Sequence, residues 1–430
     1  MSADGAPESR AGSLQGRLAR LGFVDAARAV RLLSDPGLVG LGVAAVDDLA
    51  LAPDPDLALT TLSRVAERRG GAAFVTALDT DGDLRARAYA VLGTSAALGD
   101  HLVRHPEDWV VLAAHRVDDG DPPEPAFAPA LEVRAELLHA VGADGTAAAP
   151  RASGFDTDTL SAMRAAYRRR QLAIAAADIA DAASFPDVAA ALSDLADAAL
   201  ETALAIARAE FPVDADRCSL AVVAMGKCGG RELNYISDVD VLFVAEPVEG
   251  VDETVALQSA TRLAQSLMHA CIAPTPEGSI WEVDPNLRPE GKAGALVRTL
   301  ASYDGYYHRW ASTWEFQALL KARPTAGDLD LGARFVDLVT PLVWSAADRP
   351  HFVEDVQAMR RRVEDNVPAR DADRQLKLGA GGLRDVEFSV QLLQLVHGRS
   401  DVMLHSATTI SALESLATWG YVGREDASAL

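Results

Sequence analysis

The sequence has 430 residues, of which 49% are hydrophobic and 6% aromatic, and its formal net charge is -22 at pH 7. This length predicts two or three domains, and the alanine-rich, aromatic-poor composition favours a mostly helical globular protein. The acidic balance argues against nucleic acid as a partner, because sequence-independent binding to nucleic acid relies on a basic surface.

The cysteines and the apolar runs indicate in which cellular compartment the protein is expected. Cys218, Cys228 and Cys271 are odd in number and lack CxxC spacing, so the sequence indicates neither a disulfide framework nor a zinc site. No run reaches the ~18 apolar residues of a membrane span, and the N-terminus lacks the hydrophobic core of a signal peptide. We therefore expect a reduced, cytoplasmic protein without a membrane partner.

Four regions are expected along the chain. They are a disordered lead-in over 1–13, an N-terminal helical region over 14–215, an α+β core over 216–325, and a C-terminal helical bundle over 326–430 that is cut short. Apolar residues recur at helical spacing before the core and after it, whereas the core contains short β-branched runs. A single helix is expected over 303–322, just before the C-terminal bundle.

Two aspartates begin a strand within the core. The segment 219–245 reads SLAVVAMGKCGGRELNYISDVDVLFVA, which predicts a buried strand, a glycine-rich turn and a second strand. Asp238 and Asp240 alternate with apolar residues, so both carboxylates lie on one face of the second strand. Neighbouring carboxylates repel each other unless a cation lies between them, which suits a Mg²⁺ ion that also holds a substrate phosphate.

A third acid is expected from another strand, at 279–284. Glu282 and Asp284 face the same way there, so either can serve, and we favour Asp284 because it lies nearer the end of the strand. Three carboxylates from adjacent strands can hold two Mg²⁺ ions ~3.5–4 Å apart. This order of strands and acids is the pattern of the polymerase-β-like nucleotidyltransferase superfamily. The expected fold class is therefore α+β, a small mixed sheet with helices inside a mostly α-helical chain.

Four motifs make the resemblance more specific. In chain order they read MGKCGGRELNYISDVDVLFV, VDPNLRPEGKAGALV, TWEFQALLKARP and KLGAGGLRDVEF. Together they closely resemble the glutamine synthetase adenylyltransferase/adenylyl-removing enzymes, a family with two nucleotidyltransferase units. The earlier segment LGTSAALGDHLVRHPEDW is similar to the family's N-terminal region. The resemblance thus covers roughly residues 92–398 and makes 216–325 a nucleotidyltransferase catalytic core.

The resemblance implies roles for individual residues. Asp238, Asp240 and Asp284 are implied to be catalytic and to bind two Mg²⁺ ions. The residues implied to bind phosphate or nucleotide are Gly229, Gly230, Ser237, Arg288 and Lys292. On the next predicted helix, Trp314, Gln317 and Lys321 fall at i, i+3 and i+7. This polar stripe predicts contact of Gln317 and Lys321 with nucleotide or phosphate, and a domain-packing face with Trp314 in the core is the alternative. For Lys292 a solvated turn lysine is an equal alternative. The family often reads VDMRLRP where this chain has VDPNLRP, so Asn286 leaves one cationic side chain missing.

A glycine turn over 379–382 leads into a predicted helix, an arrangement that can bind an anion. Asp385 and Glu387 lie in the first turn of that helix, where they stabilise the helix dipole themselves and repel a phosphate. Lys377 and Arg384 offset this repulsion. An anion-binding role for the turn and a purely structural one both stay open.

The resemblance also implies a reaction. About 215 mostly helical residues precede the unit, which matches the N-terminal half, to which the family assigns adenylyl removal. The implied reaction is phosphorolysis, in which inorganic phosphate attacks the AMP phosphorus on an adenylylated tyrosine of glutamine synthetase and releases ADP. Phosphate is already anionic near neutral pH, so the reaction needs no strong general base. His269 and His308 are therefore interpreted as packing or surface residues.

The implied partners are adenylylated glutamine synthetase, inorganic phosphate or ADP, and a PII signal protein. Two alternatives stay open. The first is the forward reaction, in which an ATP-dependent adenylyltransferase of the same fold attaches AMP. The second is a catalytically idle domain that senses a regulator or docks glutamine synthetase. The set of three acids argues against the second alternative, because a binding module has no need to hold repelling carboxylates together.

Overall fold

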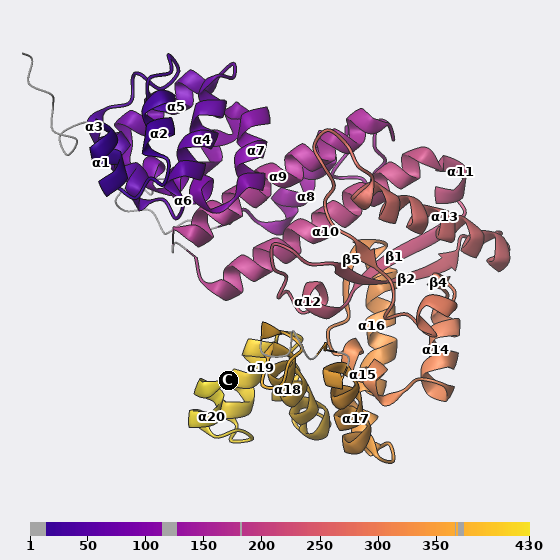
Figure 1. Ribbon diagram of the computed structural model, residues 1–430. Coiled ribbons are helices and arrows are strands. Elements are labelled where there is room, and N and C mark those ends of the chain that lie inside the picture. The colour runs from indigo at the N-terminus through magenta and orange to yellow at the C-terminus, as the bar shows by residue number, and fades with distance from the viewer. Residues whose placement is uncertain (1–13, 114–126, 181–182, 366, 369–373) are drawn as a thin grey trace, which may run out of the picture. The chain divides into compact units, whose positions relative to one another are not determined.

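Figure 1 shows the computed structural model of the chain, which describes residues 14–113, 127–180, 183–365, 367–368 and 374–430. The predicted lead-in, 1–13, lies outside them. The α+β fold class is confirmed, because one small mixed sheet lies among many helices. No helix in these ranges is both long enough and apolar enough to cross a bilayer.

The chain forms two compact units. The first comprises Met1–Pro129 and Arg164–Ala191, and the second comprises Ala130–Met163 and Leu192–Leu430. Two long helices, α9 (Thr157–Ile179) and α10 (Phe185–Glu210), contribute residues to both units. The predicted boundaries at 215/216 and 325/326 both fall inside the second unit and stay predictions.

The first unit consists of short helices with polar caps. Its described elements are α1 (Leu14–Arg20), α2 (Ala26–Leu33), α3 (Val43–Asp48), η1 (Leu49–Leu51), α4 (Pro55–Ala66), α5 (Gly71–Thr80), α6 (Gly82–Thr94), α7 (Ala96–Arg104) and η2 (Pro106–Leu112). Helix α4 shows why they start where they do. Asp54 accepts a hydrogen bond from the Leu57 N–H, and Pro55 occupies the first helical position, where no N–H is needed.

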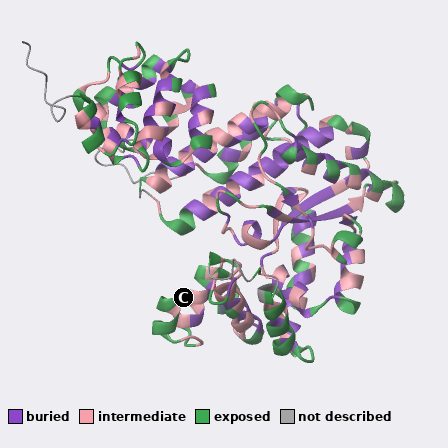
Figure 2. Cartoon of the chain, in the orientation of Figure 1, coloured by how far each residue is buried: buried purple, intermediate pink, exposed green. Residues whose placement is uncertain are grey.

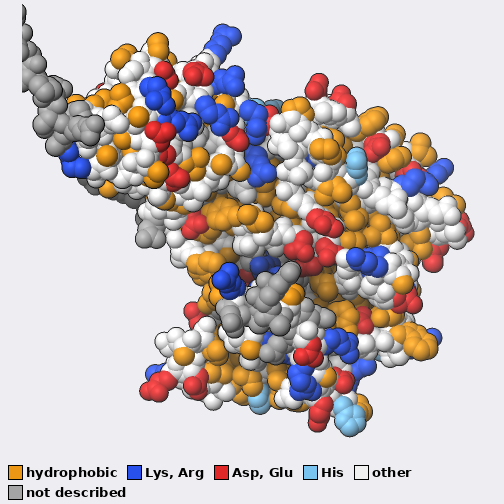
Figure 3. Space-filling view, viewed as in Figure 1, with side chains coloured by type: hydrophobic (Ala, Val, Ile, Leu, Met, Phe, Trp, Pro, Cys, Tyr) orange, Lys and Arg blue, Asp and Glu red, His pale blue; other side chains and the backbone are white. Residues whose placement is uncertain are grey.

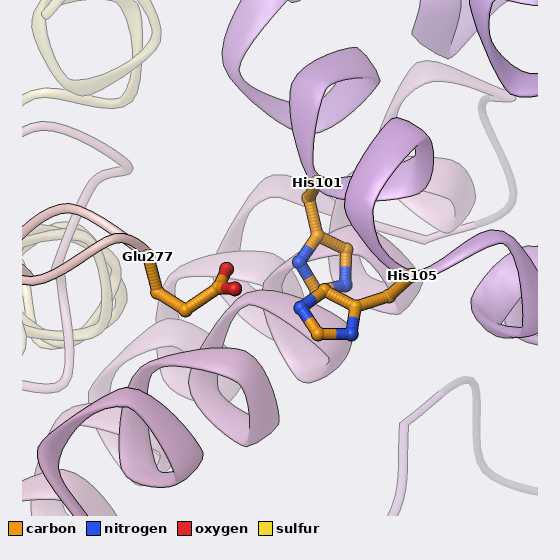
Figure 4. A group of neighbouring side chains, drawn as sticks. All are labelled: His101, His105 and Glu277. Carbon is orange, nitrogen blue, oxygen red and sulfur yellow. The ribbon is translucent and has the colours of Figure 1, made fainter. Parts of the chain in front are cut away.

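A buried histidine ties two of these elements together. The His101 side chain is fully buried, and its Nε2 lies 2.8 Å from Asp108 Oδ2. Figure 4 shows the His101 ring close to that of His105, with 4.9 Å between the ring centroids. Glu277, drawn in the same view, belongs to the second unit. We interpret the His101–Asp108 pair as a packing contact between α7 and η2, because both partners lie within the first unit.

The helices of the second unit surround its sheet and continue to the C-terminus. Its described elements are α8 (Ala130–Ala140), α11 (Pro212–Ala215), α12 (Gly226–Gly229), α13 (Glu253–Ile272), η3 (Gly291–Ala293), α14 (Leu300–Arg309), α15 (Thr313–Leu319), α16 (Leu329–Trp344), η4 (Ala346–Asp348), α17 (Phe352–Asp365), α18 (Leu383–His397), η6 (Val402–Leu404), α19 (Thr409–Thr418) and α20 (Arg424–Ala429). The C-terminal part is helical, as the sequence predicts.

The sheet has five strands. They are β1 (Cys218–Ala224), β2 (Val239–Pro247), β3 (Val283–Asp284), β4 (Val297–Arg298) and β5 (Arg323–Gly327), in the order β3-β2-β1-β5 with β4 also paired to β2. Strand β1 is antiparallel to β2 and β5, whereas β3 and β4 are parallel to β2. Figure 2 shows β1 and β2 buried along most of their length. Leu242 and Val244 on one face of β2 pack against a core that includes Tyr303 and Phe335.

Three predicted elements differ from the structure. The strand predicted over 279–284 is only Val283–Asp284, because the Ile280 N–H bonds back to Cys271 O, at the end of α13, rather than to β2. The helix predicted over 303–322 is interrupted before α15, where Ser312 and Glu315 form a capping box. Strand β5 begins at Arg323 and was not predicted.

The three cysteines are free thiols, and all of them are buried. Burial raises the pKa of the Cys218 thiol to about 11, with a smaller contribution from the charge of Asp214. Burial also raises the pKa of Cys228 well above its ordinary value. Acidic and basic side chains both occur on the face visible in Figure 3, so the net negative charge forms no field of one sign there.

Candidate active site

The parallel pairing of β2 with β3 brings two of the three predicted acids together. Asp240 and Asp284 are partners in this register, and Asp238 directly precedes β2. One carboxylate oxygen from each of the three lies within 4.8 Å of the others. Glu282, the alternative third acid, is exposed and is not a member of this group. We call Asp238, Asp240 and Asp284 the acidic group.

Within the acidic group, Asp240 is the carboxyl whose charged form is disfavoured. Burial raises the pKa of the Asp240 carboxyl to about 6, and the charges of Asp238 and Asp284 add to this increase. Lys377 and Arg384 act in the opposite direction. A carboxylate that is partly buried beside two others is the kind of group whose charged form a bound cation stabilises. The donor set therefore fits a hard divalent cation.

The glycine turn approaches the acidic group at Gly226. This residue has a φ of +53°, and a Cβ added there would overlap Asp240 Oδ2. The preceding Met225 N–H donates to Asp240 O at 2.8 Å, so the turn lies directly against β2. Sequence reasoning missed this glycine. Its place at the end of a predicted strand was the available indication.

The two glycines that the resemblance implied as phosphate contacts have packing reasons in the structure. A Cβ on Gly229 would overlap Lys321 O, and one on Gly230 would lie 2.8 Å from Ala407 O. Both glycines are buried. Their missing side chains thus let the turn pack closely on later backbone. Phosphate binding at these two positions stays a prediction, with Gly226 nearer to the acids.

The loop after β3 is held by its own hydrogen bonds. Asp284 Oδ1 accepts from the Asn286 N–H at 2.7 Å, which anchors the carboxylate. Arg288 donates to Pro285 O at 2.9 Å, to Gly294 O at 3.2 Å and to Lys292 O at 3.3 Å. The Arg288 guanidinium therefore shapes the loop, with two of its five N–H groups left for other acceptors.

The remaining predicted site residues divide into two kinds. Ser237 lies beside the acids, with its Oγ 3.5 Å from Asp238 Oδ1, and Lys292 is exposed. Gln317, by contrast, is 3% exposed, and its Nε2 donates to Gln391 Oε1 at 2.8 Å. Lys321 is 4% exposed. The structure thus buries Gln317 and Lys321, and their contact with nucleotide or phosphate stays a prediction.

Lys321 is the centre of a buried ion-pair network. Its ammonium donates to Glu232 Oε2 and Glu387 Oε1, both at 2.8 Å, and to Thr409 Oγ1 at 3.2 Å. An ammonium has three N–H donors, so all of them are used on protein acceptors. Burial lowers the pKa of Lys321, but the charges of Glu387 and Glu232 outweigh it and raise the pKa above its ordinary value. The network joins the glycine turn to α18 and α19.

Three cations, Lys227, Lys377 and Arg384, interact electrostatically with the acidic group, and none of them was predicted as a site residue. Lys227 donates to Asn234 Oδ1 at 3.0 Å, and burial followed by the charge of Lys377 lowers the Lys227 pKa. Arg384 has the same effect on Lys227, and both Lys377 and Arg384 act on Asp240. The sequence leaves an anion-binding role open for the motif that contains Lys377 and Arg384. Its closeness to Asp240 was not predicted, because it depends on how residues far along the chain fold back.

Comparison with known proteins gives two family matches. The model described as Glutamate-ammonia ligase adenylyltransferase matches residues 86–337, and the model described as GlnD PII-uridylyltransferase matches residues 357–430. The first match covers the sheet and the acidic group. The second covers Lys377, Arg384 and the C-terminal helices.

Curated relatives match almost the whole chain. A Bifunctional glutamine synthetase adenylyltransferase/adenylyl-removing enzyme of Streptomyces avermitilis is 51% identical over 424 residues, which is 97% of this chain and 40% of the relative. Proteins of the same name are 52% identical over 423 residues in Streptomyces coelicolor and 48% identical over 428 residues in Nocardia farcinica. Each of these two matches covers 96% of this chain and 40% of the relative. The chain thus spans about 40% of the length of these relatives.

Proposed function

The chain belongs to the glutamate-ammonia ligase (glutamine synthetase) adenylyltransferase family, and on that premise we propose that it removes AMP from adenylylated glutamine synthetase. The observation that carries the proposal is the acidic group, three carboxylates on paired strands within 4.8 Å of one another. A phosphoryl-transfer site needs such a group to place positive charge beside a phosphate.

In this proposal Asp238, Asp240 and Asp284 hold Mg²⁺, as a pair of ions. When bound, Mg²⁺ supplies positive charge that neutralises the oxygens of the phosphoryl group. The chain's own part is to fix the carboxylates in place. The Asn286 N–H holds Asp284, and the glycine turn at Gly226 packs against Asp240. Preorganised groups of this kind lower the cost of reorganisation during the reaction.

The proposed reaction is phosphorolysis. An oxygen of hydrogen phosphate forms a bond to the AMP phosphorus, and the bond from that phosphorus to the tyrosine oxygen breaks. The tyrosine oxygen takes the proton of hydrogen phosphate, so the products are ADP and unmodified tyrosine. Removal is favoured over attachment because helices over 14–210 precede the sheet, as the resemblance implies for the adenylyl-removing half.

The proposal includes further partners. Adenylylated glutamine synthetase is the substrate, and inorganic phosphate and ADP are the small ligands. A PII signal protein is included as a regulatory partner, which the match of 357–430 to a PII-uridylyltransferase model supports. A cytoplasmic location is part of the same proposal, and the buried free thiols agree with it.

The test uses the 430-residue chain with adenylylated glutamine synthetase, Mg²⁺ and inorganic phosphate. We expect ADP to form only when phosphate is present, together with loss of AMP from the tyrosine. Incorporation of AMP from ATP, without phosphate-dependent ADP, would instead show the forward adenylyltransferase. Binding of glutamine synthetase without either reaction would show an idle docking domain.

Mg²⁺ binding is expected to weaken as the pH falls through the Asp240 pKa of about 6. Only the deprotonated carboxylate is a ligand, so the affinity should fall about tenfold per pH unit well below that value and be nearly constant above about pH 7. Isothermal titration of Mg²⁺ at about pH 5, 6 and 7 measures this. The same affinity at all three pH values would contradict it.

The same raised pKa has a consequence for the metal-free chain. Asp240 binds a proton more tightly in the folded state than in the unfolded state, where its pKa is near the ordinary value of 3.8. Its contribution to the free energy of unfolding therefore falls as the pH rises from about 4 to about 6. Thermal unfolding with and without Mg²⁺ over this window separates the effect of the acidic group from that of other carboxyls.

A further inference from the structure

The loop before α18 brings two cations of the chain together. The Leu383 N–H donates to Leu376 O at 2.9 Å, and the Arg384 N–H donates to Lys377 O at 3.0 Å. Gly381 has a φ of +73°, and a Cβ on Gly382 would lie 2.5 Å from Leu376 O. The glycines of this motif therefore close the loop, so that Lys377 and Arg384 lie on adjacent backbone although they are seven positions apart.

These two cations interact electrostatically with the acidic group but are not paired with it. Both act on the charge of Asp240, yet no hydrogen bond or ion pair joins the Lys377 ammonium to any residue in the described ranges. Arg384 donates one bond, from its Nη1 to Glu387 Oε2 at 3.2 Å, which leaves most of its five donors available. Lys377 and Arg384 thus provide positive charge and N–H donors that a bound anion can use.

The position of Arg384 is set from inside the protein. Glu387 accepts from Arg384 with one oxygen and from the buried Lys321 with the other, at 2.8 Å. Burial raises the Glu387 pKa, but the charges of Lys321 and Arg384 outweigh it and lower the pKa. Glu387 is therefore a charged bridge between Lys321 and Arg384. The Arg384 guanidinium also lies over the Phe388 ring, with Cζ 5.8 Å from the ring centroid.

We propose that Lys377 and Arg384 bind the phosphate that attacks AMP, and that Lys321 and Glu387 are positioning residues that hold Arg384 toward it. This inference rests on the proposed function and adds to it the binding site of the second anion. Arg384 can meet two phosphate oxygens at once, and Lys377 adds a point charge. Both cations act on the charge of Asp240, so a phosphate bound by them lies within electrostatic range of the acidic group.

The binding test needs no glutamine synthetase. We expect Arg384→Gln and Lys377→Gln, in the full chain with Mg²⁺, each to weaken the binding of radiolabelled inorganic phosphate in equilibrium dialysis about tenfold or more. Arg424→Gln removes an exposed arginine on α20 and is the matched control, for which we expect unchanged affinity. Unchanged phosphate affinity in both Arg384→Gln and Lys377→Gln would overturn the proposal.

A second arm identifies which phosphate is bound. ADP carries the same chemical group, so its affinity is measured in the same variants. Loss of ADP affinity with intact phosphate affinity would overturn the assignment to the attacking phosphate. If the variants lose phosphate binding while the parent chain releases no ADP from adenylylated glutamine synthetase, the anion site stands and the proposed function fails. If the parent chain releases ADP from adenylylated glutamine synthetase while the variants keep their phosphate affinity, the proposed function stands and the anion site fails.

The KM for phosphate tests the positioning role of Glu387. Glu387→Gln keeps the shape of the bridge and removes its charge, so it should raise the KM for phosphate several-fold while the KM for adenylylated glutamine synthetase stays unchanged. Combined with Arg384→Gln, it should add no further loss, because both changes remove one coupled unit. Additive losses of phosphate affinity in the double variant would show that Glu387 acts independently of Arg384 and would overturn the positioning role.

Discussion

Asp240→Asn is expected to lower the rate of ADP release at least ~10³-fold, because it removes a charged ligand from the centre of a two-ion phosphoryl-transfer site. Asp240 is the register partner of Asp284 on the neighbouring strand and lies beside Asp238. The fold should persist, because the amide has the same shape and relieves repulsion among three acids. The measurement is phosphate-dependent ADP release at saturating Mg²⁺, with circular dichroism to confirm folding.

The matched control for this change is Glu282→Gln. Glu282 is exposed, precedes β3 directly and lies outside the acidic group. Removing its charge should change the rate by less than about threefold, because its screened charge lies in solvent. Full activity of Asp240→Asn would contradict the metal-site assignment, and so would equal losses in Asp240→Asn and Glu282→Gln.

Lys321→Met is expected to have the largest effect on stability, a loss of ~3–5 kcal/mol in the free energy of unfolding. The change leaves Glu232 and Glu387 without the cation that pairs with both of them, and the Lys321 side chain is only 5% exposed. Denaturation by urea, followed at the midpoint and slope of the transition, measures the loss.

Lys292→Met provides the comparison. Lys292 is exposed in the loop after β3, so the same substitution there should change the free energy of unfolding by no more than ~0.5 kcal/mol. A Lys321 variant as stable as the parent chain would show that the network contributes little beyond what it costs to desolvate its charges. The Lys321→Met/Glu387→Gln double variant should recover part of the loss, because one of the unpaired carboxylates is gone.

Local patterns in the sequence were sufficient to predict the acidic group. Alternation placed Asp238 and Asp240 at the start of β2, and the preference for Asp284 over Glu282 agrees with the group that the structure brings together. Strand β5 was missed because its residues, RPTAG, show no alternation and contain a proline and a glycine. They form a strand because β1 offers an open edge, which is a tertiary effect.

The ion pairs of Lys321 could not be predicted from the residues that surround it in the sequence. Its acceptors Glu232, Glu387 and Thr409 are 89, 66 and 88 positions away in the sequence. The polar stripe on its predicted helix left nucleotide contact and a domain-packing face both open. Only the fold shows that these two carboxylates and one hydroxyl accept from its ammonium. The same holds for Arg384, whose neighbours depend on the closing of the loop at Gly381 and Gly382.

The burial of the three thiols has a practical consequence. Only a thiolate reacts with maleimides and related reagents, and burial keeps Cys218 and Cys228 protonated at neutral pH. A cysteine introduced at Ile236, which is 91% exposed and two residues before Asp238, would then be the preferred site of attachment for a fluorophore or spin label. A probe there would report the arrival of a substrate beside the acidic group in a chain that otherwise keeps its natural sequence.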